Sequence, residues 1–195
     1  MPLNIAVLGS TKGTDMQAII GEIEKGELDA RIVAVVSDRK GAFILERARK
    51  HKIPAVFIDP KKFPVRKEFD RQVMHELEDA KAELVLLIGY MRIVGDEMVR
   101  KYRNRLINIH PSLLPEFAGG MDRDVHEQVL KAGKKETGCT LHIVTEDVDA
   151  GPILLQKRVP VLSGDTAETL KERVQKAEQE AILEGIRLFM KGKAG

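Results

Sequence analysis

Short apolar runs alternate with amphipathic segments along the first half of the chain. The runs are rich in Ile, Val, Leu and Ala, which is typical of strands buried on both faces of a parallel sheet, and they occupy residues 5–8, 31–37, 55–58 and 83–88. Apolar positions recur with helical spacing in residues 16–24, 42–51 and 67–79. This alternation predicts an α/β fold with a doubly wound, mostly parallel sheet and right-handed crossovers.

The second half of the chain continues the pattern. Apolar or alternating runs predict three more strands, at residues 106–110, 137–144 and 153–159. A short helix is expected from about residue 125 to residue 131. A long amphipathic helix is expected over residues 166–191, with Asp165 or Thr166 as its N-cap.

Composition limits the number of domains and the classes of partner. With 195 residues, 43% of them hydrophobic, the chain is long enough for one well-packed domain and short for two, so residues 1–195 are expected to form a single domain. The 32 Lys and Arg residues are interspersed with 30 Asp and Glu residues, and the net charge of +2 argues against a nucleic-acid or membrane surface. No apolar segment reaches the length of a membrane span, so a cytoplasmic location is expected.

Cys139 is the only cysteine, which excludes an intrachain disulfide and a cysteine metal cluster. We interpret it as a small buried residue of a strand. His110, His126, His142 and Cys139 lack the spacing of zinc ligands, so no metal is expected.

Two polar residues stand at the end of the run at residues 106–110. Asn108 and His110 are two apart, so in a strand they project from the same face, and Pro111 ends the strand after them. Open α/β sheets bind ligands at the carboxyl ends of their strands. An amide donor beside an imidazole suits attack on a carbonyl group, because one stabilises an oxyanion and the other exchanges protons. The alternative is that Asn108 only ends the strand and His110 has a structural role.

Residues 9–15 form a glycine-bearing turn between the first strand and the first helix. A helix N-terminus with nearby glycine is typical of an anion site. Gly9 and Gly13 do not give a dinucleotide motif, and Lys12 precedes Gly13, which excludes a Walker A loop. A single phosphate is therefore the expected anion. The alternative is that Thr14 or Asp15 only caps the helix.

Residues 108–115, Asn-Ile-His-Pro-Ser-Leu-Leu-Pro, resemble the signature of the folate-dependent formyltransferases. Residues 147–154, Asp-Val-Asp-Ala-Gly-Pro-Ile-Leu, resemble the aspartate loop of the same family, at about the right distance along the chain. The resemblance covers nearly the whole chain and implies a Rossmann-like formyltransferase fold with an antiparallel C-terminal part. It also implies phosphate and nucleotide binding by the N-terminal half, and folate binding and catalysis by the C-terminal half.

The resemblance implies a role for each residue that matches a family position. The catalytic residues would be Asn108, His110 and Asp149. The substrate would be bound by Gly13, Thr14, Asp15, Gln175, Lys176, Ala177 and Glu178. The folate would be bound by Arg66, Met91, Arg92, Ile93, Val94, Asn108, Thr145, Glu146, Asp147, Val148 and Asp149.

Two features depart from the family pattern. Asp15 stands where the family commonly has an uncharged amide, and Lys12 is a candidate to offset its charge. The loop at residues 116–123 is longer than usual, and Asp122 and Asp124 bring carboxylates to it or next to it.

The activity implied is transfer of a formyl group from 10-formyltetrahydrofolate to the amine of glycinamide ribonucleotide in de novo purine biosynthesis. Asp149 would raise the pKa of His110 and relay protons through water. The partners would be these small molecules alone, bound by a monomer or homodimer. The alternatives are a deformylase-like hydrolase of the folate and an inactive nucleotide-binding module, whereas family members with extra domains would not fit in 195 residues.

Overall fold

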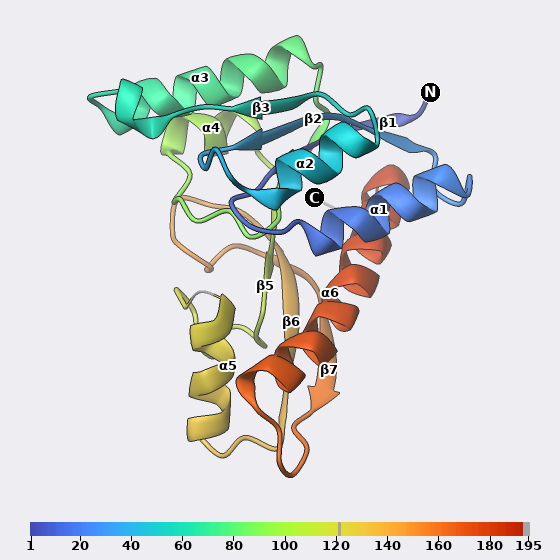
Figure 1. Cartoon of the computed structure of the whole chain (residues 1–195), viewed down its shortest axis with the longest axis vertical. Coiled ribbons are helices and arrows are strands. Elements are labelled where there is room, and N and C mark those ends of the chain that lie inside the picture. The colour runs from blue at the N-terminus through green and yellow to red at the C-terminus, as the bar shows by residue number, and fades with distance from the viewer. Residues whose placement is uncertain (121, 193–195) are drawn as a thin grey trace. The chain divides into compact units, whose positions relative to one another are not determined.

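The computed structural model describes residues 1–120 and 122–192 (Figure 1). Its Cα packing divides the chain into two compact units, Met1–Ile107 and Asn108–Gly195. Among the described residues, seven strands follow one another in the hydrogen-bonded order β3-β2-β1-β4-β5-β6-β7. β1 pairs in parallel with β2 and β4, β2 pairs in parallel with β3, and β6 pairs with β7 antiparallel. The predicted doubly wound, mostly parallel sheet with an antiparallel C-terminal part is confirmed.

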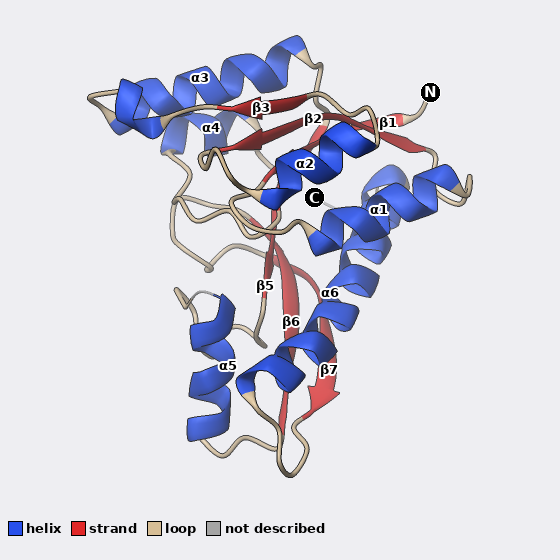
Figure 2. Cartoon of the chain, viewed as in Figure 1, coloured by secondary structure: helices blue, strands red, loops and turns tan. Residues whose placement is uncertain are grey.

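Unit 1 contains β1 (Leu3–Leu8), α1 (Thr14–Glu24), β2 (Ala30–Ser37), α2 (Phe43–Lys50), β3 (Ala55–Phe57), the 3-10 helix η1 (Pro60–Lys62), α3 (Arg66–Asp79), β4 (Leu84–Leu87) and α4 (Asp96–Lys101). β5 (Leu106–His110) begins in this unit and ends in the next (Figure 2). Ile5, Val7 and Leu8 of β1 are fully buried, as expected of a central parallel strand. α1 packs on α2, and α3 packs on α4.

Helix α1 begins earlier than predicted and has a different cap. Its N-cap is Gly13, in the left-handed conformation with φ 65°, and no side chain caps the helix. The alternative that Thr14 or Asp15 is the N-cap is therefore wrong, since both residues already lie inside the helix. A Cβ at Gly13 would lie 2.4 Å from Ile44 of α2, so glycine is required here by space as well as by conformation.

Unit 2 contains α5 (Asp122–Lys131), β6 (Glu136–Ile143), β7 (Ile153–Pro160) and α6 (Ala167–Met190). α6 packs along β6 and β7 and against α5 (Figure 1). A Cβ at Gly185 would lie 2.1 Å from Leu141, so glycine lets α6 approach β6 closely. The cap prediction is confirmed at Thr166, whose hydroxyl accepts from the Thr169 amide while the Thr169 hydroxyl accepts from the Thr166 amide.

Three boundaries or elements differ from the predictions. η1 and α4 were not predicted, because three and six residues are too few to show a helical period. α5 begins at Asp122 rather than near residue 125, so the loop expected at residues 116–123 ends sooner. Met121 of that loop and the side chain of Asp122 lie outside the described part of the structure.

Cys139 is fully buried in β6, as predicted. Within the described residues, no helix is long and apolar enough to cross a membrane.

Candidate active site

The end of β5 brings two polar side chains to one place. Leu106, Ile107 and Ile109 are buried, Asn108 is half-buried, and His110 is 3% exposed at the last position of the strand. Both polar side chains contact Asp149, which confirms that they share a face of β5.

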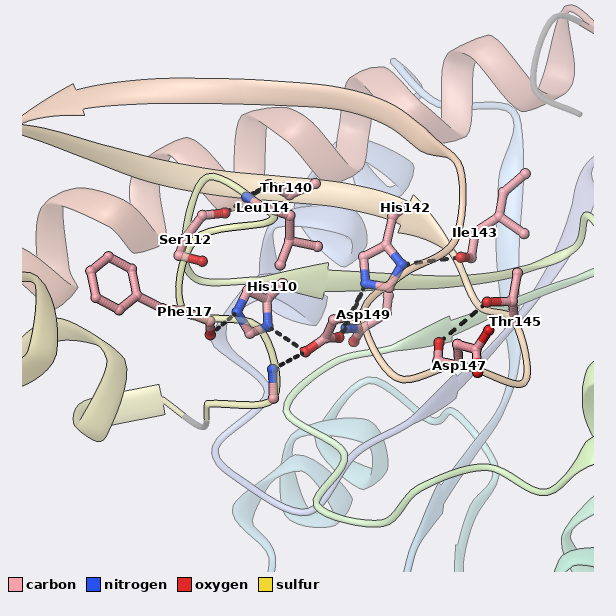
Figure 3. Close-up of polar contacts among 12 residues, drawn as sticks. His110, Ser112, Leu114, Phe117, Thr140, His142, Ile143, Thr145, Asp147 and Asp149 are labelled. Atoms are coloured by element: carbon pink, nitrogen blue, oxygen red, sulfur yellow. Dashed lines mark hydrogen bonds and ion pairs between the residues drawn. The ribbon is translucent and has the colours of Figure 1, made fainter.

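Asp149 lies in the loop between β6 and β7, and its carboxylate joins the two histidines of this site (Figure 3). Oδ2 lies 3.3 Å from Nδ1 of His110, and Oδ1 lies 3.4 Å from Nε2 of His142. Asp149 itself has φ 53°, a left-handed conformation that Asp and Asn tolerate better than other non-glycine residues. A Cβ at Gly151 would lie 1.9 Å from the Ile143 carbonyl oxygen, so glycine lets the loop pass close to the end of β6.

Both ring nitrogens of His110 face acceptors. Nε2 lies 3.1 Å from the carbonyl oxygen of Phe117 and donates to it, because a carbonyl oxygen can only accept. Nδ1 faces the Asp149 carboxylate, which favours a second proton on the ring.

The net direction of the pKa of His110 nevertheless differs from the prediction. Burial holds the pKa of His110 below its ordinary range, and the opposing effects of the Asp149 charge and the Phe117 carbonyl do not overcome it. The charge of Asp149 raises the pKa of His110, as predicted. The predicted net rise is wrong, because burial lowers this pKa by more and the sequence does not reveal how deeply the ring is buried.

His142 orients Asn108. Nδ1 of His142 donates to the carbonyl oxygen of Ile143 at 3.0 Å, so Nε2 is the ring nitrogen that faces Asn108 and Asp149. Nδ2 of Asn108 lies 3.1 Å from that Nε2 and 3.5 Å from Oδ1 of Asp149. The first contact is a normal hydrogen bond and the second is at the limit of one.

The pKa of Asp149 lies below its ordinary range. Burial alone would raise it, but the His142 ring, the Gly119 amide and the His110 ring together outweigh burial. The Gly119 N–H donates to Oδ2 at 2.8 Å. An ionised carboxylate therefore lies between two imidazoles that are 3% and 2% exposed, where charges interact more strongly than in water.

Thr140 of β6 braces the turn that follows β5. Its hydroxyl donates to the carbonyl oxygen of Ser112 at 2.7 Å and accepts from the Leu114 amide at 2.9 Å (Figure 3). It also accepts from Nε2 of Gln156 at 2.9 Å. Ser112 donates in turn to the carbonyl oxygen of Glu116 at 2.5 Å. These bonds fix the chain that leads from His110 to the backbone groups of Phe117 and Gly119.

The relatives of the chain decide its family. The sequence profile described as "Formyl transferase" matches residues 3–186. The chain belongs to the formyl transferase family. The "Phosphoribosylglycinamide formyltransferase" of Escherichia coli (strain K12) is 39% identical over 176 residues, which are 90% of this chain and 82% of that protein.

Two further relatives are similar over a longer part of the chain. The crystal structure of glycinamide ribonucleotide transformylase 1 from Symbiobacterium toebii has a TM-score of 0.93 at 44% identity and covers 98% of this chain and 89% of that chain. The "Trifunctional purine biosynthetic protein adenosine-3" of Gallus gallus is 44% identical over 97% of this chain. The chain spans only 19% of the length of that trifunctional protein.

The remaining residues expected from the formyl transferase resemblance lie at defined positions in each unit. In unit 1, Gly13, Thr14 and Asp15 start α1, Arg66 is the first residue of α3, and Met91, Arg92, Ile93 and Val94 follow β4. In unit 2, Thr145, Glu146, Asp147 and Val148 precede Asp149 in its loop, and Gln175, Lys176, Ala177 and Glu178 lie on α6. Asp15 is 6% exposed whereas Lys12 is exposed to solvent, and the compensation of one by the other stays a prediction.

Sequence reasoning missed four groups of this site. His142 and Thr140 are polar residues two apart in a buried strand, and this pattern could have indicated them. The Phe117 carbonyl and the Gly119 amide are backbone groups, for which a sequence has no signal. Among the described residues, no group of three or more His, Cys, Asp or Glu side chains could hold a metal ion.

Proposed function

We propose that this formyltransferase moves a formyl group from 10-formyltetrahydrofolate to the amine of glycinamide ribonucleotide in purine biosynthesis. The observation that carries the proposal is the cluster of Asn108, His110 and Asp149 at the end of β5. The names of the relatives support the same reaction, since two of them are a phosphoribosylglycinamide formyltransferase and a glycinamide ribonucleotide transformylase.

Transfer requires that one C–N bond form while another breaks. The substrate amine attacks the formyl carbon, the formyl oxygen takes up negative charge, and the tetrahedral intermediate then releases N10 of the folate. One proton leaves the amine and one reaches N10, so no redox partner is needed. In this reaction the protein stabilises the oxyanion and moves the proton.

Asn108 is the proposed oxyanion donor. One of its N–H groups is held by Nε2 of His142 at 3.1 Å, which fixes the plane of the amide. The second N–H makes only the 3.5 Å contact with Asp149, so it is the one free to turn toward an oxyanion. His142 is thus a positioning residue for Asn108.

His110 is the proposed proton carrier. The Phe117 carbonyl holds its Nε2–H, and Asp149 stabilises a proton on Nδ1. Because burial lowers the pKa of His110, the ring holds this second proton loosely and can return it near neutral pH. Asp149 supports the imidazolium form while the oxyanion exists.

The residues at the start of α1 and the four residues Gln175, Lys176, Ala177 and Glu178 are proposed to bind the ribonucleotide. Arg66, the segment after β4 and the loop that contains Asp149 are proposed to bind the folate. The single formyltransferase domain over residues 1–195, a cytoplasmic location and a monomer or homodimer stay predictions.

A product assay tests the proposal against its alternatives. The protein is incubated with 10-formyltetrahydrofolate, with and without glycinamide ribonucleotide, and formylated ribonucleotide and formate are both measured. We expect formylated ribonucleotide only when the amine is present and little formate without it. Formate released equally in both samples would indicate a hydrolase, and turnover in neither would indicate an inactive binding module.

A further inference from the structure

The buried carboxylate of Asp70 lies near two arginines, Arg66 and Arg92, in unit 1. Asp70 is one helical turn after Arg66 in α3, and its side chain is 8% exposed. Its Oδ2 lies 3.5 Å from Nε of Arg66, whose side chain is 47% exposed. The Arg66 side chain therefore runs from a buried acceptor to the surface.

Arg92, in the segment after β4, lies over the aromatic ring next to Asp70 in the sequence. Its guanidinium carbon lies 4.7 Å from the centre of the Phe69 ring, which precedes Asp70 in α3. The Phe69 ring is fixed in turn by an edge-on contact with Phe63, with 5.8 Å between the ring centres. The charge of Arg92 acts on Asp70 together with that of Arg66. Thus Phe69 supports the face of the Arg92 guanidinium group.

Gly95 makes room for this carboxylate. A Cβ at Gly95 would lie 2.4 Å from Oδ2 of Asp70. The backbone of Gly95 has φ −81° and ψ 157°, which any residue adopts. Glycine is required at this position by the space that the carboxylate occupies, not by the backbone conformation.

The charges at this place do not cancel. Burial raises the pKa of Asp70, and Arg66 and Arg92 oppose that effect. Asp70 pairs with Nε of Arg66, and no carboxylate of the described residues lies within ion-pair distance of Arg92, so the guanidinium group of Arg92 can pair with a carboxylate of a ligand. A bound carboxylate would complete the pairing, because guanidinium groups bind carboxylates through paired N–H donors.

We propose that Asp70 is a positioning residue that pairs with Arg66 and attracts Arg92 at longer range, so that both guanidinium groups meet the glutamate carboxylates of the formyl donor. This inference rests on the proposed function, since it takes the donor to be a folate. Asp70 does not touch the donor itself and acts through the two arginines.

The test compares two formyl donors that differ only in the tail. One is 10-formyltetrahydrofolate and the other is the methylamide of 10-formyltetrahydropteroate, which has neither the glutamate nor a carboxylate in its place. In Asp70→Asn we expect the KM of the first donor to rise about tenfold, as for one misplaced charge-assisted hydrogen bond, with kcat nearly unchanged. The KM of the tail-free donor should stay at its wild-type value. A purely structural role would change both donors alike.

A second variant displaces the Asp70 carboxylate without removing it. Gly95→Ala places a methyl group where Oδ2 of Asp70 lies, and should give the same rise that depends on the tail. If Asp70→Asn does not fold, the two KM values of Gly95→Ala test the role of Asp70 instead. The matched control is Glu97→Gln, because Glu97 also pairs with two cations of α3, Lys67 and Arg71, and should leave both KM values unchanged.

An equal change of KM for both donors in the folded variants, or no change, would overturn the role of Asp70 alone. Wild-type protein that transfers formyl from neither donor would overturn the proposed function, and this inference with it. The two failures are therefore distinguishable in one set of measurements.

Discussion

Each oxygen of the Asp149 carboxylate faces its own imidazole, His110 at Oδ2 and His142 at Oδ1. The carboxylate therefore acts on the proton of one ring and on the ring that orients Asn108. Its third partner is the amide of Gly119. Since these groups all lie outside the loop that contains Asp149, the side chain links that loop to the end of β5.

Removing the charge of Asp149 while keeping its shape should change the chemical step. Asn tolerates the left-handed conformation found at residue 149, so Asp149→Asn should fold normally. The variant loses the charge that raises the pKa of His110, and this pKa, already lowered by burial, should fall further. We expect a lower kcat, an unchanged affinity for the ribonucleotide, and an ascending limb of the pH–rate profile at lower pH.

The control for this variant is Asp79→Asn, which removes the carboxylate from an exposed pair with His75. Its pH–rate profile should match that of the wild type. If Asp149→Asn kept a normal rate and an unshifted pH–rate profile, the role of Asp149 would be only to stabilise the turn in its loop, because Asn is an equally good turn former.

At the scale of single residues, the sequence predicted the groups whose spacing or motif is specific. Asn108 and His110 follow from alternation along a strand, and Asp149 follows from the motif at residues 147–154. The Phe117 carbonyl could not be predicted, because nothing in a side chain indicates where a loop carbonyl will point. The sequence likewise does not show that burial outweighs Asp149 at His110, since burial depends on how the strands pack.

At the scale of elements, Thr140 ties β6 to the turn after β5 through two hydrogen bonds and accepts a third from Gln156 of β7. It is fully buried, so water cannot replace those bonds when they are lost. The turn leads from His110 to Phe117 and Gly119, whose backbone groups contact the side chains of His110 and Asp149. Thr140 therefore couples the stability of unit 2 to the geometry of the site.

Thr140→Val keeps the shape of the side chain and removes the hydroxyl. We expect the free energy of unfolding to fall by about 1–3 kcal/mol, the penalty for leaving buried polar groups unpaired. The kcat of the folded protein should also fall, because the turn that carries the Phe117 carbonyl is less fixed. Urea unfolding and initial rates at one temperature measure the two effects.

Thr137→Val is the matched control, since Thr137 is buried in the same strand but projects from the opposite face. It should leave kcat unchanged. Equal losses of kcat in the two variants would show that the site responds to any change in β6 rather than to the brace at Thr140.

The elements themselves were largely predictable, and the exceptions have physical causes. Runs of buried Ile, Val and Leu mark β1, β2 and β4, and a long amphipathic period marks α6. The start of α1 was misplaced because a left-handed Gly13 caps it in place of a side chain. The register shift between Leu141 and His142, where Leu154 of β7 is skipped, depends on pairing between strands and has no local sequence signal.

At the scale of the whole molecule, buried titratable groups make stability depend on pH. The pKa of His110 is lowered from its ordinary 6.5, so as the pH falls through 6.5 the unfolded chain binds a proton that the folded protein does not. The pKa of Asp149 is lowered from 3.8, so the stability it contributes is present above 3.8 and is lost below that pH. Both groups therefore favour the folded state at neutral pH over acid.

We expect the free energy of unfolding to fall when the pH is lowered from about 7 to about 5, in the range where unfolded histidine takes up its proton. In His110→Asn this fall should be shallower, because the substituted residue does not titrate. Urea unfolding curves at several pH values measure the difference. A fall of equal steepness in both proteins would contradict the lowered pKa of His110.

The doubly wound, mostly parallel sheet and the family could be predicted because strands alternate with helices and two motifs occur in order along the chain. The division into units Met1–Ile107 and Asn108–Gly195 could not, since a single run of 195 residues shows no linker or change in composition at that boundary. β5 crosses the boundary as one continuous strand, so the sequence has no break that would mark the boundary there.

The most direct test of the central claim is the rate of formyl transfer to glycinamide ribonucleotide by His110→Asn beside His75→Asn. His75 is an exposed histidine that also lies near an aspartate, so its loss controls for removing an imidazole–carboxylate pair. We expect His110→Asn to lose about a hundredfold or more in kcat, the scale of general acid–base catalysis, and His75→Asn to lose none. A folded His110→Asn protein that transfers the formyl group at a rate near that of the wild type would contradict the account.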